Sequence, residues 1–155
     1  MSGSPDKAQS LLLVEDSAED YEAVTRIFKK INPATGIFWC RSGADALDFL
    51  NNPDTGKSAR PTLILLDLNM PGLDGRDTLR LIKGDSALKQ IPVVIFTTSA
   101  SDQDIEQCYR LGANAYVQKP FSYDRLVEVI TGVRRHWFDL VLLPPDGAMP
   151  STRRE

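Results

Sequence analysis

The sequence has few cysteines and no long apolar run. Its two cysteines, Cys40 and Cys108, are too far apart to suggest a disulfide framework or a zinc knuckle, so we expect small buried residues. No run approaches the roughly 18 apolar residues of a membrane-spanning helix. The polar start MSGSPDKAQS also lacks the apolar core of a signal peptide. These absences predict a cytoplasmic protein with no membrane partner.

An excess of positive charge is also missing, because the formal net charge is -3. Such a chain lacks the basic field that draws proteins to nucleic acid, so no nucleic acid partner is expected. The 155 residues, 42% of them hydrophobic, suit one well-buried domain. We expect that domain over residues 10–138, after a disordered segment over 1–9 and before an extension over 139–155.

Short apolar runs alternate with helical patterns along the chain. Five runs are predicted to be strands: Ser10–Val14, Gly36–Arg41, Thr62–Leu66, Ile91–Phe96 and Asn114–Gln118. Helices are predicted over Ala18–Ile31, after an N-cap at Ser42, around Leu79–Ile82, over Asp102–Leu111 with Gly112 as a left-handed C-cap, and from an N-cap at Ser122 to about Phe138. This alternation predicts an α/β fold with right-handed crossovers and a parallel sheet covered on both faces.

Polar residues follow four of the predicted strands: Glu15 and Asp16, then Asp67, Thr97 and Lys119. Because ligands bind at the carboxyl ends of the strands in open α/β sheets, we expect these side chains to form one site. Three carboxylates there would repel one another and raise each other's pKa unless a cation lies among them. Oxygen ligands with no nearby His or Cys favour Mg²⁺, with Mn²⁺ as an alternative, over zinc.

The same side chains suit a phosphoryl group. A carboxylate can act as the nucleophile and form an acyl phosphate. Lys119 can pair with one phosphoryl oxygen, and the Thr97 hydroxyl can donate to another. Taken alone, Asp16 could simply cap the following helix, and Lys119 could be a solvated turn lysine. Their occurrence together with Asp67 favours a phosphoryl site.

Four sequence blocks resemble, in order, the receiver domain of two-component response regulators: LLLVEDS, LILLDLNMPGLDG, VVIFTT and GANAYVQKPF. The resemblance covers about Leu11 to Arg135. It implies a flavodoxin-like, doubly wound five-stranded sheet of order 2-1-3-4-5. It also implies that Asp67 accepts a phosphoryl group from a phosphohistidine of a sensor histidine kinase, so that the chain catalyses only its own phosphorylation and dephosphorylation.

The resemblance also assigns the metal and switch residues. It implies Mg²⁺ on Asp16, Asp67 and the backbone carbonyl of Asn69, with Glu15 acting through water. Thr97 and Lys119 would contact the phosphoryl group, and Tyr116 would turn inward when Thr97 moves. A strand tyrosine is usually a packing residue, and that alternative stays open for Tyr116.

The end of the sequence contains a dense apolar stretch, formed by Trp137, Phe138, Leu140, Val141, Leu142 and Leu143. Such a stretch should leave water, either by folding back on the domain or by forming a homodimer, and we favour the dimer. The WF…LP ending resembles that of single-domain regulators that partner bacterial and cyanobacterial phytochrome-type kinases. We therefore expect a stand-alone regulator in a light-sensing pathway.

A receiver for a non-phytochrome kinase is the first alternative. An aspartate-nucleophile phosphatase would need a second Asp where this chain has Asn69, and a flavin carrier would need a phosphate loop where Glu15 and Asp16 stand. His136, the single histidine, lies near a basic helix end and is not expected to donate a phosphoryl group.

Overall fold

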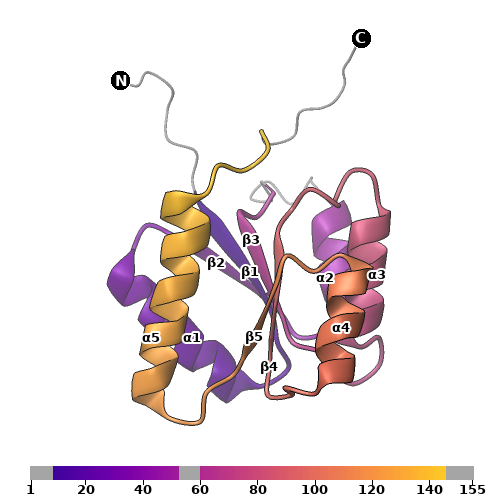
Figure 1. Ribbon diagram of the computed structural model, residues 1–155. Coiled ribbons are helices and arrows are strands. Elements are labelled where there is room, and N and C mark those ends of the chain that lie inside the picture. The colour runs from indigo at the N-terminus through magenta and orange to yellow at the C-terminus, as the bar shows by residue number, and fades with distance from the viewer. Residues whose placement is uncertain (1–8, 53–59, 146–155) are drawn as a thin grey trace.

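The computed structural model describes residues 9–52 and 60–145 (Figure 1). Within these residues five strands alternate with five α-helices: β1 Ser10–Val14, α1 Ala18–Ile31, β2 Gly36–Cys40, α2 Gly43–Asn51, β3 Leu63–Leu66, α3 Gly75–Gly84, β4 Val93–Thr97, α4 Asp102–Leu111, β5 Ala115–Gln118 and α5 Tyr123–Arg134. The strands are all parallel and lie in the order β2-β1-β3-β4-β5. The predicted fold class and strand order are therefore confirmed.

Helices cover both faces of the sheet and create two cores. Figure 1 places α1 and α5 on one face and α2, α3 and α4 on the other. Alternate residues of β1 point to opposite faces, so that Leu11 and Leu13 belong to the core under α1 and α5, whereas Leu12 and Val14 belong to the other. Strands buried on both faces are continuously apolar, which explains the apolar runs in the sequence.

Side-chain caps define where the helices begin. Ser42 and Ser122 accept hydrogen bonds from backbone N–H groups three residues further on, as predicted. Ser17 does the same for Asp20 at the start of α1, close to the acidic pair. Gly112 closes α4 with φ of 110°, the predicted left-handed conformation. The first turns of α1 and α5 follow the carboxyl ends of β1 and β5, so they lie at the carboxyl edge of the sheet.

Some predicted boundaries were wrong by a few residues. β2 ends at Cys40 instead of Arg41, and β3 begins at Leu63 instead of Thr62. β4 begins at Val93 instead of Ile91, because Pro92 has no N–H to donate to the sheet. The helical prediction to Phe138 was also wrong for its last turn, where α5 ends at Arg134 and a π-helical segment, η2 Arg135–Leu140, follows.

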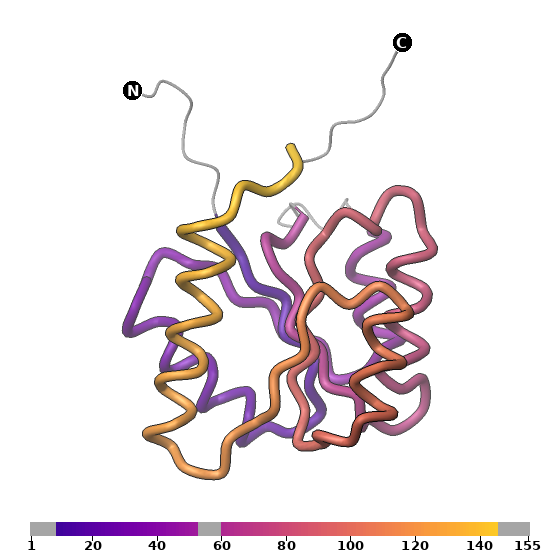
Figure 2. Tube along the Cα trace, viewed as in Figure 1, coloured from indigo at the N-terminus to yellow at the C-terminus, as the bar shows by residue number. Residues whose placement is uncertain are grey.

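The apolar end of the chain partly folds back on the domain. Phe138 of η2 is buried and packs edge-on against Phe28, with ring centroids 5.5 Å apart. The Gln9 side chain donates to the Phe138 carbonyl at 2.9 Å, so η2 lies beside the start of β1 (Figure 2). Beyond Phe138, Leu140 is 66% exposed and Leu142 is 99% exposed. The predicted segment 1–9 lies outside the described residues except for Gln9, as does the part of the predicted extension beyond Pro145.

Two further expectations concern the cysteines and the helices. Cys40 and Cys108 are both buried and carry free thiols, which confirms their prediction as small buried residues. Among the helices of residues 9–52 and 60–145, none combines the length and the apolar character needed to cross a membrane.

Candidate functional site

The backbone brings the predicted site residues to one edge of the sheet. Val14 at the end of β1 pairs with Leu66 at the end of β3, so Glu15 and Asp67 leave the sheet side by side. The Asp67 N–H donates to the Val14 carbonyl at 3.1 Å. On the other side of β3, the Lys119 N–H donates to the Thr97 carbonyl at 2.7 Å. Glu15, Asp67 and Lys119 therefore directly follow strands, and Thr97 is the last residue of β4.

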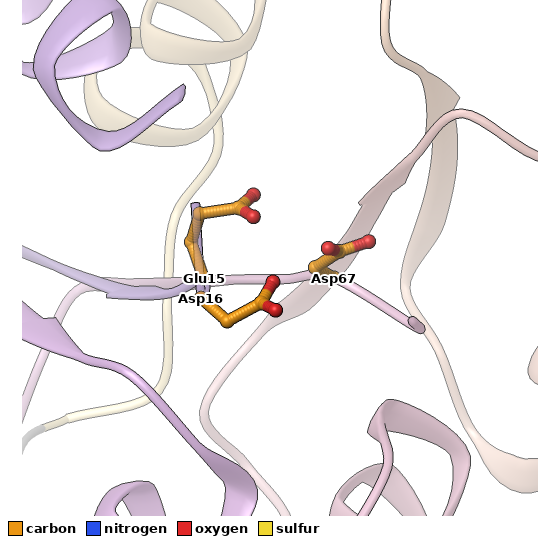
Figure 3. Close-up of side chains that lie close together, drawn as sticks. All are labelled: Glu15, Asp16 and Asp67. Carbon is orange, nitrogen blue, oxygen red and sulfur yellow. The ribbon is translucent and has the colours of Figure 1, made fainter. Parts of the chain in front are cut away.

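Three carboxyl groups converge at this edge (Figure 3). Glu15, Asp16 and Asp67 each offer one oxygen, and these atoms lie within 4.8 Å of one another. Glu15 is 1% exposed and Asp67 is 6% exposed. Burial raises the pKa of Glu15 to about 7, and the charge of Asp67 adds to this, although Lys119 acts in the opposite direction. A donor set made only of oxygens fits a hard divalent cation.

Lys119 lies among the carboxylates as a buried ammonium. Its Nζ is 2.7 Å from Glu15 Oε1, 2.7 Å from Asp20 Oδ2 and 3.5 Å from Asp67 Oδ2. Burial alone would lower the pKa of Lys119, but hydrogen bonds to Asp20 and Glu15 and the charge of Asp67 reverse this and raise it. The amine therefore stays charged, close to the predicted phosphoacceptor.

Asp20 is a site residue that the sequence analysis missed. It lies in the first turn of α1, and its side chain is 43% exposed. The available signal was its position four residues after Asp16, at the start of a helix that begins at the site edge. That spacing alone does not reveal a partner 99 residues away in the sequence.

Thr97 and Asn69 lie on the other side of Asp67. The Thr97 side chain is fully buried at the end of β4. Asn69 Nδ2 donates to Thr97 Oγ1, and the Asn69 N–H donates to Asp67 Oδ1. Both donor–acceptor distances are 3.4 Å. The long distances indicate weak bonds, so the loop after β3 contacts Thr97 and Asp67 without locking either.

Tyr116 connects this region to helices α3 and α4. Its hydroxyl donates to the Ser99 carbonyl at 3.0 Å, and its ring packs against the core under α2, α3 and α4. The Ser99 hydroxyl in turn donates to Asp104 Oδ2 at 2.7 Å. Asp104 forms an ion pair with Arg76, and the hydrogen bond from Arg76 holds the pKa of Asp104 below its usual range. The loop after Thr97 is thus tied to two helices and to Tyr116.

The sequence that forms this site matches a known protein family. A family model described as the response regulator receiver domain matches residues 11–131. The chain belongs to the receiver domain family. The predicted resemblance is therefore confirmed over most of the chain, and the four blocks that carried it lie in or beside the strands that form the site.

Individual relatives are similar over nearly their whole length. The response regulator Rcp1 from Synechocystis is 37% identical over 93% of this chain and 99% of its own. The FilR2 protein of Methanothrix harundinacea, named as a probable methanogenesis regulatory protein, is 36% identical over 82% of each chain. The phosphorylated cyanobacterial phytochrome response regulator RcpA is 33% identical, with a TM-score of 0.84 over 90% of this chain and 100% of that one.

Family membership carries general properties. Receiver domains pair with sensor histidine kinases and bind a divalent metal in an acidic pocket. A crystal structure of Rcp1 in an Mn²⁺-bound form has a TM-score of 0.81 to this chain, with 38% identity over 88% of this chain and 99% of that one. In this chain the corresponding chemistry is available at Glu15, Asp16 and Asp67.

Proposed function

We propose that this chain is a response regulator in which Asp67 accepts a phosphoryl group from a phosphohistidine of a sensor histidine kinase. The observation that supports this most strongly is the position of the Asp67 carboxylate. It lies beside two other acidic groups and 3.5 Å from the Lys119 amine, at the strand edge of a receiver fold. The proposed catalysis is limited to the regulator's own phosphorylation and dephosphorylation.

In the proposed transfer, an Asp67 carboxylate oxygen attacks the phosphorus. An oxygen–phosphorus bond forms as the nitrogen–phosphorus bond of the phosphohistidine breaks, and the imidazole nitrogen leaves with the electron pair. Lys119 is the nearest described ammonium to Asp67 and pairs with a phosphoryl oxygen. The Thr97 hydroxyl donates to another, since the transferred group carries charge that both can stabilise.

A divalent metal would be held, in this proposal, by the carboxylates of Asp16 and Asp67 and the backbone carbonyl of Asn69, and Glu15 would act through water. We expect Mg²⁺, and Mn²⁺ as a substitute. The ion would supply positive charge that relieves the repulsion among the acids and neutralises the phosphoryl oxygens. The oxygen-only donor set and the raised pKa of Glu15 support this assignment, because both indicate excess negative charge.

The proposed output begins at Thr97. If the Thr97 hydroxyl shifts toward the phosphoryl oxygens, the loop that follows β4 must shift with it. Tyr116 is bonded to the Ser99 carbonyl in that loop, and Ser99 is bonded to Asp104 of α4. A movement at Thr97 would therefore change the surface formed by α4, β5 and α5, which is the mechanism we propose for altered partner affinity.

We further propose that the partner kinase is of the phytochrome type and that the protein acts in the cytoplasm. Support comes from relatives whose names place them with phytochromes or with red light. One of them is the response regulator RPA3017, described as acting in red light signalling of R. palustris, which is 31% identical with a TM-score of 0.81. FilR2 is a relative of similar identity with a different named role. A receiver for another kinase class is therefore the second candidate.

The extension after residue 138 is proposed to form a homodimer. Leu140 and Leu142 are 66% and 99% exposed, although the preceding Phe138 is buried in the domain. Two exposed leucines at the end of η2 offer apolar surface that a second copy can cover in a two-fold interface. The receiver domain itself is proposed to span residues 10–138.

Phosphotransfer from purified kinases tests the proposed function and its pathway together. A radiolabelled phytochrome-type kinase should transfer its label to the wild-type protein and not to Asp67→Asn. Transfer to the wild-type protein should be faster from this kinase than from an unrelated kinase. Equal rates from both kinases would contradict the phytochrome pathway alone. Absence of transfer from every kinase would contradict the receiver function.

A further inference from the structure

We propose that Trp39 and Arg41 are positioning residues for the metal site. Together with Tyr21 they form a three-layer stack, here called the aromatic clamp, that holds the backbone of the acidic pair Glu15 and Asp16. The inference rests on the proposed function. It assigns a role in metal binding to residues that are not themselves proposed to contact the metal or the phosphoryl group. None of the three clamp residues bears a carboxylate or lies at the carboxyl edge of β3, β4 or β5.

The clamp is assembled from Tyr21 of α1, Trp39 of β2 and Arg41, which directly follows β2. The Tyr21 and Trp39 rings are parallel, with centroids 3.9 Å apart and planes 6° from each other. The Arg41 guanidinium carbon lies 4.6 Å from the centroid of the Trp39 ring. Stacked aromatic pairs and cation–π contacts both favour a single orientation of the rings that they join. The indole ring is therefore fixed in plane and in rotation, although Trp39 is only half-buried.

The fixed indole donates into the acidic pair. Trp39 Nε1 donates to the Glu15 carbonyl at 2.7 Å, and Arg41 Nη2 donates to the Asp16 carbonyl at 3.4 Å. The shorter distance makes Trp39 the principal contact and Arg41 the weaker one. In addition, the Glu15 N–H donates to the Cys40 carbonyl at 3.0 Å. Consecutive residues of β2 thus hold both backbone groups of Glu15.

This arrangement opposes the repulsion among the carboxylates. Glu15, Asp16 and Asp67 have oxygens within 4.8 Å of one another, and their mutual repulsion tends to spread the loop after β1. A loop held by hydrogen bonds to its own carbonyls cannot spread without breaking them. Hydrogen bonds that orient metal ligands typically change metal affinity about 10- to 100-fold when removed. The bonds from Trp39 and Arg41 act one step further out, on the backbone of the acidic pair, so we expect an effect at the lower end of that range.

A simpler interpretation is that Trp39 only packs against α1. The two interpretations differ in one atom group, because packing uses the ring faces whereas positioning uses the indole N–H. Trp39→Phe keeps an aromatic ring against Tyr21 and removes the only donor of the side chain. Trp137→Phe is the matched control, since Trp137 lies in η2 beside the start of β1, at the opposite end of that strand from Glu15.

The first test measures Mn²⁺ affinity of the unphosphorylated protein, from the signal of free Mn²⁺ in electron paramagnetic resonance. We expect Trp39→Phe to bind Mn²⁺ about tenfold more weakly than wild type, at a similar melting temperature, and Trp137→Phe to bind as wild type does. Equal affinities of Trp39→Phe and wild type would overturn the positioning role. If wild type binds no Mn²⁺ and takes no phosphoryl group, the proposed function fails together with this inference.

A second test needs no substitution and covers the case in which Trp39→Phe does not fold. In the wild-type protein, Mg²⁺ should shift the indole N–H resonance of Trp39, since its acceptor is the carbonyl of a residue at the metal site. The resonance of Trp137 should not move. A Trp39 resonance that stays unchanged while Mg²⁺ saturates the site would overturn the inference and leave the proposed function intact.

Discussion

Lys119 and Asp20 form an ion pair across the mouth of the site, with Nζ and Oδ2 2.7 Å apart. The same amine is 3.5 Å from the Asp67 carboxylate, which it must approach to stabilise a phosphoryl group. Asp20 therefore competes with the phosphoacceptor for the Lys119 amine. Its side chain is 43% exposed, so its negative charge also opposes the approach of an anionic phosphodonor.

Asp20→Asn should speed phosphorylation of Asp67 by acetyl phosphate. The side chain is 43% exposed, so the expected gain is about three- to tenfold, less than a fully buried charged hydrogen bond would give. The measurement is the initial rate of phosphoprotein formation in the presence of Mg²⁺. Glu19→Gln removes the same charge from the neighbouring residue and should leave the rate nearly unchanged. A slower Asp20→Asn variant would mean that Asp20 helps to place Lys119.

The pH dependence of stability should reflect Glu15 when metal is removed with a chelator. Its pKa is raised from 4.5 to about 7, so the native state holds the proton more tightly than the unfolded state does. This contribution is fully present below pH 4.5 and is lost as the pH rises to about 7. The loss is on the order of 3 kcal/mol, at 1.36 kcal/mol per pKa unit.

Glu15→Gln supplies the comparison for that prediction. Chemical denaturation at pH values from about 4 to 8 should show that the free energy of unfolding of wild type falls relative to that of Glu15→Gln as the pH rises. Parallel profiles for the two proteins would contradict the raised pKa. Saturating Mg²⁺ should reduce the difference, because the ion favours the charged carboxylate.

Gly75 should not tolerate a side chain. A Cβ at this position would collide with the backbone of Asp67 and Leu68. Gly75→Ala is therefore expected to lower the free energy of unfolding by about 1–3 kcal/mol and to weaken Mn²⁺ binding, because the Asp67 backbone must move. At Gly132 of α5 an added Cβ would have no described atom from another part of the chain within 4 Å, so Gly132→Ala should stabilise the helix by about 0.5–1 kcal/mol. Thermal melts of both variants measure these effects. A Gly75→Ala variant as stable as wild type would contradict the predicted collision.

Solution mass should depend on Leu142. If the exposed leucines of the extension form a homodimer, Leu142→Asp should convert the protein from dimer to monomer, because an interfacial carboxylate would lose its hydration. Light scattering with and without beryllofluoride measures this and shows whether dimerisation responds to the occupied site. Leu81→Asp changes another exposed leucine, 46% exposed on α3, and should stay dimeric. A monomeric wild-type protein would rule out the proposed dimer.

Much of the site could be predicted because it depends on strand ends. Once five apolar runs are aligned as parallel strands, Glu15, Asp67 and Lys119 must meet at one edge, and the 3.5 Å between Lys119 and Asp67 agrees with that expectation. The capping residues Ser42 and Ser122 were predictable for a similar reason, since a cap acts within three residues of its own position.

Other features depend on packing that local sequence does not encode. The Asp20 contact requires the first turn of α1 to face the end of β5, 99 residues away. The bond from Trp39 to the Glu15 carbonyl depends on how α1 packs against β2, because Tyr21 sets the plane of the indole. The π-helical turn of η2 accompanies the packing of Phe138 on Phe28. The apolar pattern of the sequence predicts that Phe138 leaves water, but it does not identify Phe28 as the partner.

The most direct test of the account is the chemical identity of the phosphorylated residue. Wild type, Asp67→Asn and the control Asp48→Asn, which changes an aspartate of α2, are incubated with acetyl phosphate and Mg²⁺. The acyl phosphate is then reduced with borohydride, and the modified position is mapped by mass spectrometry. We predict modification at Asp67 in wild type and in Asp48→Asn, and none in a folded Asp67→Asn. An unmodified wild type, or equal modification of Asp67→Asn, would contradict the proposed function.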